Sequence, residues 1–216
     1  MDTTRRSLLA TVGGASTIGL AGCLGSLGGG GAGNCDPQEE PPVNSLPVPA
    51  MGDGDVMVKV WSDYACPHCR TFTVEALPKI EENYVASGDV TYEHHDFPIP
   101  VSEKWSWGAA SAARGVQDSM DDEAFFEMST LLFENQDKYT MKLVGDLAEQ
   151  VGADRCAIVG DAQYDTYRPV LEQDRQRGVN RGVQGTPAIF VDGEQVDFSG
   201  AQSFYPPIEE AIENAL

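Results

Sequence analysis

The motif Cys66-Pro67-His68-Cys69 constrains the fold more than any other part of this sequence. A short apolar run from Val56 to Trp61 precedes it, and the length of that run suits a buried strand. Apolar residues then recur at roughly helical spacing before a closing glycine, namely Phe72, Leu77, Ile80 and Tyr84. The first cysteine is therefore predicted to lie where a strand ends and a helix begins.

This position favours a thiolate at Cys66. Free N–H groups and the positive end of the helix dipole stabilise an anion at the start of a helix, so Cys66 is predicted to ionise more easily than a free cysteine. Pro67 suits the first helical turn, because its missing N–H is not needed there. His68 can add a proton or a hydrogen bond beside the sulfur. Cys69 follows one turn later, where it can close a disulfide with Cys66 and resolve a mixed one.

Metal binding is an alternative for this motif, because Cys-x-x-Cys is also half of a zinc site. The other ligands would have to come from the adjacent pair His94 and His95. Neighbouring strand residues point to opposite faces, so the two rings rarely share one ion, and no metal site is predicted. A purely structural disulfide within the motif is also disfavoured, because so short a loop restrains the unfolded chain very little.

The rest of the chain has the alternating pattern of an α/β protein. Residues 90–97 predict a second strand, and residues 102–177 have a helical composition. Gly185-Thr186-Pro187 precedes another apolar run, which ends at the hairpin signal Asp192-Gly193. Pro206-Pro207 opens a final helix with one apolar face.

Taken in this order, these elements resemble the DsbA-like branch of the thioredoxin superfamily. Four further stretches are similar to that branch: Trp61-Ser62-Asp63-Tyr64, Leu77-Pro78-Lys79-Ile80, Asp96-Phe97-Pro98-Ile99 and Leu132-Phe133-Glu134-Asn135-Gln136. The resemblance covers residues 54–215 and implies an α/β thioredoxin fold with an inserted α-helical domain at about residues 102–177. It also implies thiol–disulfide exchange on protein substrates outside the cytoplasm, without a cofactor.

The resemblance further implies a role for each residue of the site. Cys66 matches the nucleophile, Cys69 matches the resolving thiol, and Pro67-His68 matches the dipeptide that tunes the pair. Pro187 matches a proline whose cis peptide bond lies against the active-site sulfurs. Thr186 matches the residue whose backbone pairs with the substrate.

Val60 departs from the pattern of the family. Many relatives have a buried glutamate six residues before the nucleophile, which assists proton transfer. Valine has no titratable group, so this proton route is in doubt here. Asp63 lies three residues further along the chain, and whether it substitutes is left open.

The direction of electron flow has two interpretations. The Pro-His dipeptide resembles the strongly oxidising members, and export favours oxidation because disulfides persist in oxidising compartments. Dithiol oxidation is therefore the first hypothesis. Thr186 is common in relatives that reduce or isomerise disulfides, which is the alternative, and a non-catalytic metal-binding lipoprotein is an alternative of another class. The predicted partners are exported proteins with cysteine thiols or disulfides, and a membrane partner that recycles the active site.

Residues 1–22 predict a signal peptide. Arg5-Arg6 and the mild apolar stretch after it are typical of twin-arginine export. Leu20-Ala21-Gly22-Cys23 resembles a lipobox, in which the cysteine carries lipid; an uncleaved membrane anchor and a plain soluble signal are the alternatives. Residues 23–53 contain a glycine run and several prolines, which predict a flexible tether. We therefore expect a domain anchored to the outer face of the cell membrane.

The charge balance excludes one class of partner. The chain has 34 Asp and Glu against 14 Lys and Arg, a formal net charge of -20. A nucleic-acid binder needs a basic surface to neutralise phosphates, so nucleic acid is not a predicted partner. An acid-rich surface is one solution found in halophiles, and this chain is predicted to have such a surface.

The remaining cysteines suggest a second disulfide. If Cys23 carries lipid, four of the five cysteines are left. Spacing assigns Cys66 to Cys69, which leaves Cys35 and Cys156 as the other pair. The alternative is a solvent-exposed Cys35 and a buried, inert Cys156, and both interpretations stay open at this point.

Overall fold

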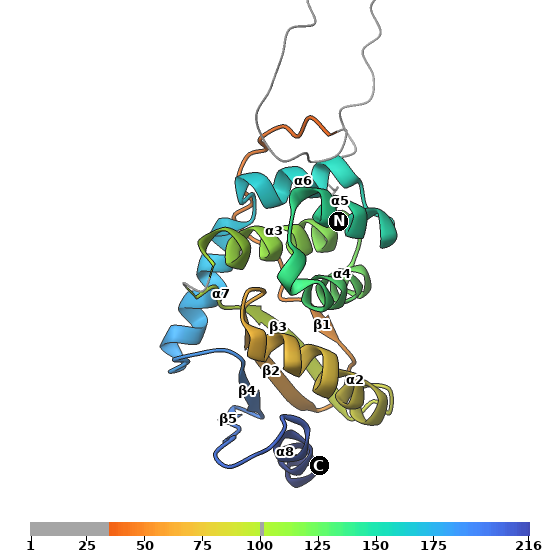
Figure 1. Cartoon of the computed structure of the whole chain (residues 1–216). Coiled ribbons are helices and arrows are strands. Elements are labelled where there is room, and N and C mark those ends of the chain that lie inside the picture. Colours follow the sequence, from red (N-terminus) through yellow and green to blue (C-terminus); the bar gives the residue numbers. More distant parts are fainter. Residues whose placement is uncertain (1–34, 100–101) are drawn as a thin grey trace, which may run out of the picture.

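The computed structural model describes residues 35–99 and 102–216. In this part of the chain, a five-stranded mixed sheet has the order β1-β3-β2-β4-β5 (Figure 1). Its strands are β1 (Ala50–Met51), β2 (Val56–Ser62), β3 (Val90–Asp96), β4 (Ala188–Val191) and β5 (Glu194–Gln195). β2 and β3 are parallel, whereas the other neighbouring strands are antiparallel. This sheet, with the helices described below, is the predicted α/β thioredoxin fold.

A long helix follows β2 and covers one face of the sheet. Its consecutive segments are α1 (Pro67–Thr71), η2 (Phe72–Ala76), α2 (Leu77–Ile80) and η3 (Glu81–Val85), of which η2 and η3 are π-helical. α8 (Tyr205–Ala215) lies beside it (Figure 1). The apolar side chains of strands and helices meet in one core, which includes Val58, Val60, Ile189, Phe72, Ile80, Ile208 and Ile212. Burial of this apolar surface is the main force that holds the long helix on the sheet.

The end of β2 that precedes the motif is buried from both sides. Trp61 packs against Phe97 and Phe190 on the face opposite the long helix. α7 (Arg168–Asn180) approaches this cluster so closely that a Cβ atom at Gly178 would lie 2.7 Å from side-chain atoms of Trp61 and Phe97. A glycine is therefore required for α7 to reach the sheet here.

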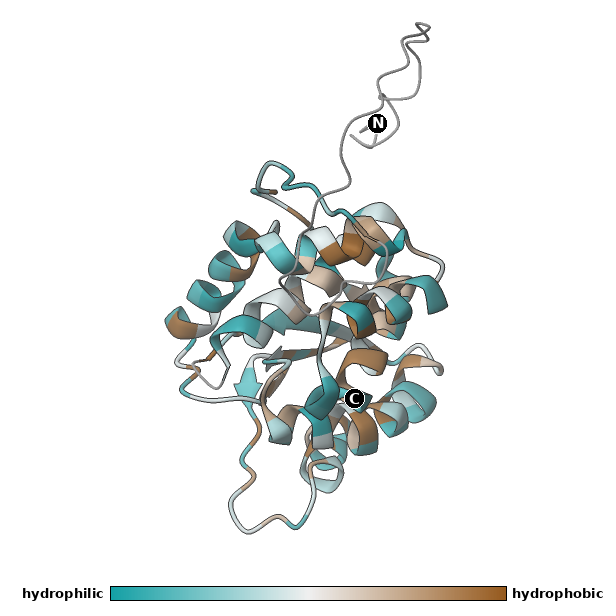
Figure 2. Cartoon of the chain, turned by 45° about the horizontal axis from the view of Figure 1, so that its top comes forward, coloured by the Kyte–Doolittle hydropathy of each residue, from teal (hydrophilic) through white to brown (hydrophobic). Residues whose placement is uncertain are grey.

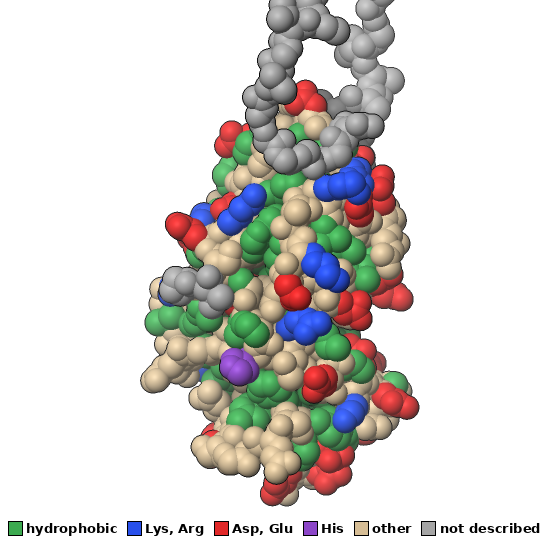
Figure 3. All heavy atoms as spheres, viewed as in Figure 1, with side chains coloured by type: hydrophobic (Ala, Val, Ile, Leu, Met, Phe, Trp, Pro, Cys, Tyr) green, Lys and Arg blue, Asp and Glu red, His purple; other side chains and the backbone are tan. Residues whose placement is uncertain are grey.

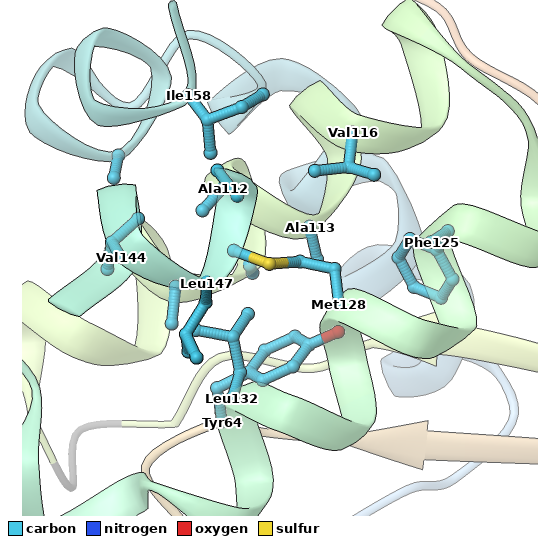
Figure 4. Close-up of a cluster of buried hydrophobic side chains, with 14 of the residues drawn as sticks. Tyr64, Ala112, Ala113, Val116, Phe125, Met128, Leu132, Val144, Leu147 and Ile158 are labelled. Atoms are coloured by element: carbon cyan, nitrogen blue, oxygen red, sulfur yellow. The ribbon is translucent and has the colours of Figure 1, made fainter. Parts of the chain in front are cut away.

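An all-helical part lies between β3 and β4. Before α7 it consists of α3 (Glu103–Ser119), α4 (Asp122–Glu134), η4 (Gln136–Lys138), α5 (Met141–Gln150) and α6 (Arg155–Tyr164). Figure 4 shows apolar side chains of these helices pointing toward one another, with Met128 among them. Tyr64, from the loop before Cys66, points into the same cluster. The helical part therefore packs directly against the redox motif.

Local signals explain where these helices begin. The N-cap side chains Ser102, Asp121, Thr140 and Asp154 each accept a hydrogen bond from a backbone N–H of the first turn of α3, α4, α5 and α6. Such caps satisfy donors that have no partner within the helix. Figure 2 shows hydrophilic and hydrophobic residues alternating along these helices, as expected for helices with one buried face.

A buried arginine joins the helical part to the sheet. Arg114 of α3 is 0% exposed. Its Nε donates to Asp96 Oδ2 of β3 at 2.7 Å, and its Nη2 donates to Asp174 Oδ2 of α7 at 2.6 Å. Nη1 donates to the carbonyl oxygen of Pro47 and to Gln117 Oε1. One guanidinium thus bonds three segments that are far apart in the sequence, besides Gln117 on its own helix, and no polar pattern in the sequence indicated it.

The segment 35–51 differs from the predicted tether. Residues 23–34 of that tether, with Cys23, lie outside the described residues, as does the predicted signal peptide. The later residues lie against the helical part, since Val43 N–H donates to Thr166 O at 2.9 Å and Gln173 donates to Asn44 O at 2.8 Å. β1 then adds to the sheet edge. Proline-rich composition cannot build a core, but it leaves backbone carbonyls free to accept hydrogen bonds from helix side chains.

A disulfide ties this segment to α6. Cys35 and Cys156 are bonded, with their Cα atoms 5.3 Å apart. This is the pairing that the number of cysteines suggested, and the bond joins two residues that are 121 positions apart in the sequence. Replacing both cysteines by serine is expected to lower the free energy of unfolding by about 2–5 kcal/mol, because the unfolded chain then regains conformational entropy.

Chemical denaturation with and without the Cys35→Ser/Cys156→Ser change measures this loss. The matched control is the protein with Cys35 and Cys156 intact, and both samples carry Cys66→Ser and Cys69→Ser, so that the Cys35–Cys156 bond is the difference between them. An unchanged unfolding midpoint would show that the bridge does not stabilise the fold.

Candidate active site

Cys66 lies at the junction that the sequence predicted. β2 ends at Ser62, and α1 begins at Pro67, so Cys66 is the N-cap of α1 in an extended backbone conformation. Its N–H donates to the carbonyl oxygen of Asp63 at 3.0 Å, which closes the turn between strand and helix. Pro67 occupies the first helical position, where a missing N–H costs nothing.

The two sulfurs of the motif differ in their electrostatics. A hydrogen bond from the Cys69 thiol, with further help from Thr186 and the backbone N–H groups of Cys69 and His68, outweighs burial and lowers the pKa of Cys66 to about 5. Burial, and then the neighbouring Cys66, raises the pKa of Cys69 well above its ordinary value. Cys66 is 4% exposed and Cys69 is 0% exposed. At neutral pH the reduced pair is therefore one thiolate, at Cys66, and one buried thiol.

His68 contacts the Cys66 sulfur through its backbone, whereas the sequence predicted a role for its side chain. Its backbone N–H is the group that lies at the Cys66 sulfur, whereas its side chain is exposed. The peptide backbone at the start of α1 therefore adds to the effect of the Cys69 thiol on Cys66, and the role of the His68 imidazole stays a prediction.

The thiolate absorbance of the reduced protein is expected to titrate with a midpoint near 5. A free cysteine titrates near about 8.5. Because the pKa is lowered in the folded state, the thiolate stabilises the reduced fold fully above about pH 8.5, and this contribution is lost as the pH falls through 5. Ultraviolet titration of wild-type protein and of the Cys66→Ser variant measures it. A wild-type midpoint of about 8.5 would contradict the lowered pKa of Cys66. An absorbance step near pH 5 that is still present in the Cys66→Ser variant would contradict its assignment to Cys66.

Thr186 lies beside the Cys66 sulfur, although the two residues are 120 positions apart in the sequence. The Thr186–Pro187 peptide bond is cis, as the resemblance implied. The Cys66 sulfur lies 3.3 Å from the carbonyl oxygen of Thr186. β4, which begins at Ala188, pairs with Trp61 of β2 and so carries this loop to the end of the motif's own strand.

Val60 has no titratable group, and the loop between it and Cys66 contains one carboxyl group, that of Asp63. Val60 is buried in the middle of β2 between Ile189 and His94 of the flanking strands. Asp63 lies in the loop before Cys66, where its carboxylate accepts hydrogen bonds of 2.6 Å from the N–H groups of Ala65 and Ile99. Burial raises the pKa of Asp63 to about 6. Its own N–H donates to the Cys69 sulfur at 3.5 Å.

His94 and His95 do not form a metal site with the cysteines. The His94 ring packs against Tyr64 and Phe125, whereas the His95 ring stacks on Trp61 and faces Asp174. The two rings thus point to opposite faces of β3, as the sequence predicted. Among the described residues, no group of three or more His, Cys, Asp or Glu side chains is placed to hold a metal ion.

Sequence reasoning missed the contacts that the helical part makes with the motif. Gln136 donates to backbone carbonyl oxygens of the loop before α1, and Arg70 Nε donates to Phe133 O at 3.1 Å. Tyr64 donates from its hydroxyl to Ser129 Oγ at 2.9 Å. The similarity of Leu132–Gln136 to the family is the signal in the sequence that points to this contact.

Comparisons with known proteins agree with this geometry. A family model described as thioredoxin matches residues 49–210. Disulfide bond formation protein D of Bacillus subtilis (strain 168) is 28% identical over 184 residues, which cover 82% of this chain and 80% of that protein. The crystal structure of oxidised BdbD from Bacillus subtilis superposes with a TM-score of 0.68 at 27% identity, over 81% of this chain and 98% of that one. Chlamydia trachomatis DsbA shares the fold, with a TM-score of 0.69 at 18% identity over 82% and 96% of the two chains.

Proposed function

The chain belongs to the thioredoxin family whose model matches residues 49–210, and on this basis we propose that it is a DsbA-like oxidoreductase that oxidises protein dithiols outside the cytoplasm. One observation carries the proposal most directly. The Cys66 sulfur has a strongly lowered pKa at the start of α1, while the Cys69 sulfur is buried one turn away with a raised pKa. This asymmetry stabilises the reduced pair, and a stabilised reduced form makes its disulfide a strong oxidant.

The reaction proceeds by two exchanges of sulfur partners. A substrate thiolate attacks the Cys66 sulfur of the oxidised pair, the Cys66–Cys69 bond breaks, and Cys69 leaves and takes up a proton because its pKa is high. A second substrate thiolate attacks the substrate sulfur of this mixed disulfide, and Cys66 leaves as the stabilised thiolate. The substrate gains one disulfide and loses two electrons, which reduce the pair to one thiol and one thiolate.

Thr186 supplies the surface on which the substrate is held. Its carbonyl oxygen and the Cys66 sulfur are 3.3 Å apart, so an extended substrate segment that pairs with the Thr186 backbone would bring its own sulfur to Cys66. Backbone recognition is independent of the substrate's side chains. The substrates we propose are therefore exported proteins with cysteine thiols or disulfides, without a narrow sequence preference.

The reduction potential of the Cys66–Cys69 couple tests this function. After equilibration with glutathione, we expect a value more positive than about -220 mV, the upper edge of the extracted cytosolic glutathione poise. A value near the about -270 mV of thioredoxin would instead favour the alternative, a disulfide reductase or isomerase of the same fold. Stoichiometric binding of zinc or copper by reduced protein that shows no exchange would favour the non-catalytic metal-binding lipoprotein.

Each turnover leaves the pair reduced, so a second partner has to remove two electrons. We propose a redox partner in the membrane, because a domain tethered to the membrane surface meets such a partner repeatedly at a high effective concentration. Cys66 would be the attacking thiolate in this step, since it is the more exposed sulfur of the pair. It would attack a disulfide of the partner, and Cys69 would then displace the partner's sulfur, which restores the Cys66–Cys69 disulfide and leaves the partner with two thiols.

Export and anchoring rest on the N-terminal sequence. We propose that residues 1–22 direct twin-arginine export and that Cys23 carries lipid, which would anchor the protein to the outer face of the cell membrane. Within residues 35–99 and 102–216, no helix is long and apolar enough to span a bilayer. Mass analysis of membrane-derived protein, with Cys23→Ser as the comparison, tests this. An unmodified Cys23 in the mature protein would exclude the lipid anchor.

The acidic surface supports a further proposal, that the protein works in concentrated salt. The formal net charge is -20, and Figure 3 shows Asp and Glu side chains mainly along the edges of one face, with several Lys and Arg side chains among them. Repulsion among exposed charges is screened within about 3 Å at 1 M salt. A thermal midpoint that is the same in dilute buffer and in molar salt would contradict a halophile-like surface.

A further inference from the structure

The segment that follows α4 lies against the loop that carries Cys66. α4 ends at Glu134, and the turn η4 begins at Gln136. The Gln136 Nε2 atom lies 2.9 Å from the carbonyl oxygen of Tyr64 and 2.9 Å from that of Cys66. A side-chain amide has two N–H donors, so both bonds can form at the same time. These bonds span 72 and 70 residues of sequence.

Two neighbouring contacts hold the same loop. The Tyr139 hydroxyl lies 3.2 Å from Tyr64 O and 2.9 Å from Leu132 O, and with one hydrogen it donates to only one of them. Arg70 of α1 donates to Phe133 O. Gln136 differs from both, because it is the side chain that bonds the carbonyl of Cys66 itself.

The two bonded carbonyls flank Ala65, and they fix the direction in which the chain enters α1. Cys66 needs its extended N-cap backbone conformation, with φ -84° and ψ 120°, to place its sulfur before the first helical turn. The Cys66 carbonyl also accepts the N–H of Arg70 at 3.2 Å, which is the first hydrogen bond of the helix. Without Gln136, this carbonyl would keep its helical bond, but the Tyr64 carbonyl and the loop before it would lose a donor.

We propose that Gln136 is a positioning residue of the redox site, whose amide clamps the carbonyls of Tyr64 and Cys66 so that the Cys66 sulfur faces the N–H groups at the start of α1. This inference rests on the proposed function, and it gives the helical part a chemical role in the exchange reaction. A thiolate gains from backbone N–H groups only when it is aligned with them, because hydrogen bonds weaken steeply with angle. Gln136 is half-buried, so it can hold the loop without a large desolvation cost.

The test replaces the amide with a side chain of similar shape that cannot donate, Gln136→Met. The matched control is Gln150→Met at the exposed end of α5 in the same helical part. Loss of one or two hydrogen bonds to the loop is expected to change the equilibrium constant with glutathione about tenfold, in the direction of a weaker oxidant. For a two-electron couple this change lowers the reduction potential by about 30 mV. The thiolate titration of Cys66 is expected to shift upward in the Gln136 variant and to stay at the wild-type midpoint in the control.

Two measurements separate positioning from a purely structural role. If Gln136→Met lowers the thermal midpoint but leaves both the potential and the Cys66 titration at wild-type values, Gln136 only stabilises the fold and the inference is wrong. If Gln136→Met does not fold, Gln136→Asn is the second variant. Its side chain keeps the amide but is one carbon shorter, so the amide lies further from the loop. The reduction potential of the Cys66–Cys69 couple is expected to fall in this variant as well. A wild-type protein without exchange activity would instead contradict the proposed function itself.

Discussion

Cys66→Ser is expected to abolish thiol–disulfide exchange, whereas Cys69→Ser is expected to leave a reactive thiol that accumulates mixed disulfides with its substrates. Serine cannot form the disulfide bond, and the attacked sulfur is lost in the first variant. In the second variant Cys66 keeps its place at the start of α1, but no thiol at position 69 can displace a substrate that is bonded to it. The two cysteines are therefore expected to give opposite results.

Non-reducing gels and mass analysis of both variants, isolated from cells after rapid alkylation, measure this outcome. The control is the double variant Cys66→Ser/Cys69→Ser, which should trap no partner. Cys35 and Cys156 stay intact in all samples, because they are bonded to each other and do not compete for substrates. Partners trapped by Cys66→Ser alone would reverse the roles assigned to the two sulfurs.

Arg114→Met is expected to destabilise the fold by about 3–5 kcal/mol at neutral pH, because breaking a buried ion pair leaves uncompensated charge. Asp96 and Asp174 are each 1% exposed and would lose the Arg114 guanidinium. Asp174 would keep its ion pair with Arg177 and its contact with His95. The carbonyl of Pro47 would lose one of its two donors, so the segment 35–51 would also loosen. The control is Arg155→Met on α6, whose ion-pair partners Asp146 and Glu149 are 40% and 60% exposed, so a much smaller loss is expected.

The pH dependence of this loss gives a second readout. Burial alone would raise the pKa of Asp96, but Arg114 and then His94 hold it below its ordinary value. In wild-type protein this carboxylate therefore contributes stability above the pKa of the unfolded state, about 3.9, and the contribution is lost as the pH falls through the lower folded value. In Arg114→Met burial dominates, so protonation of Asp96 favours the folded state. Urea unfolding at pH 7 and pH 4 measures the free energy of unfolding of both proteins. The difference between wild type and Arg114→Met is expected to be smaller at pH 4. An equal difference at the two pH values would contradict this role of Asp96.

The redox motif itself was predictable from the sequence, because its chemistry is local. A buried strand, a cysteine at a helix start and a second cysteine one turn later all lie between Val56 and Cys69. Helix propensity, capping and the helix dipole act over a few residues, so sequence spacing carries this information. The assignment of Thr186 and Pro187 to the same site came from the resemblance to a family, since nothing local in the chain relates them to Cys66.

In segment 35–51, the structure differs from the flexible tether that the amino-acid composition predicted. Glycine and proline runs predicted a tether, and the same residues instead lie along the helical part, tied by a disulfide and by hydrogen bonds to their backbone carbonyls. Composition reports how much apolar surface a segment can bury. It does not report whether distant side chains will satisfy its backbone groups.

The sequence by itself indicated where the strand gives way to the helix and which sulfur is expected to be the nucleophile, and its acidic charge balance argues against nucleic acid as a partner. Only the tertiary structure decided that Cys35 is bonded to Cys156, that the Asp63 carboxylate is buried and accepts two backbone hydrogen bonds, and that Gln136 bonds the loop before α1. The physical reason is the range of the interactions. The first group depends on neighbours within one helical turn or on total charge, whereas the second depends on which surfaces meet when the helical part packs on the sheet.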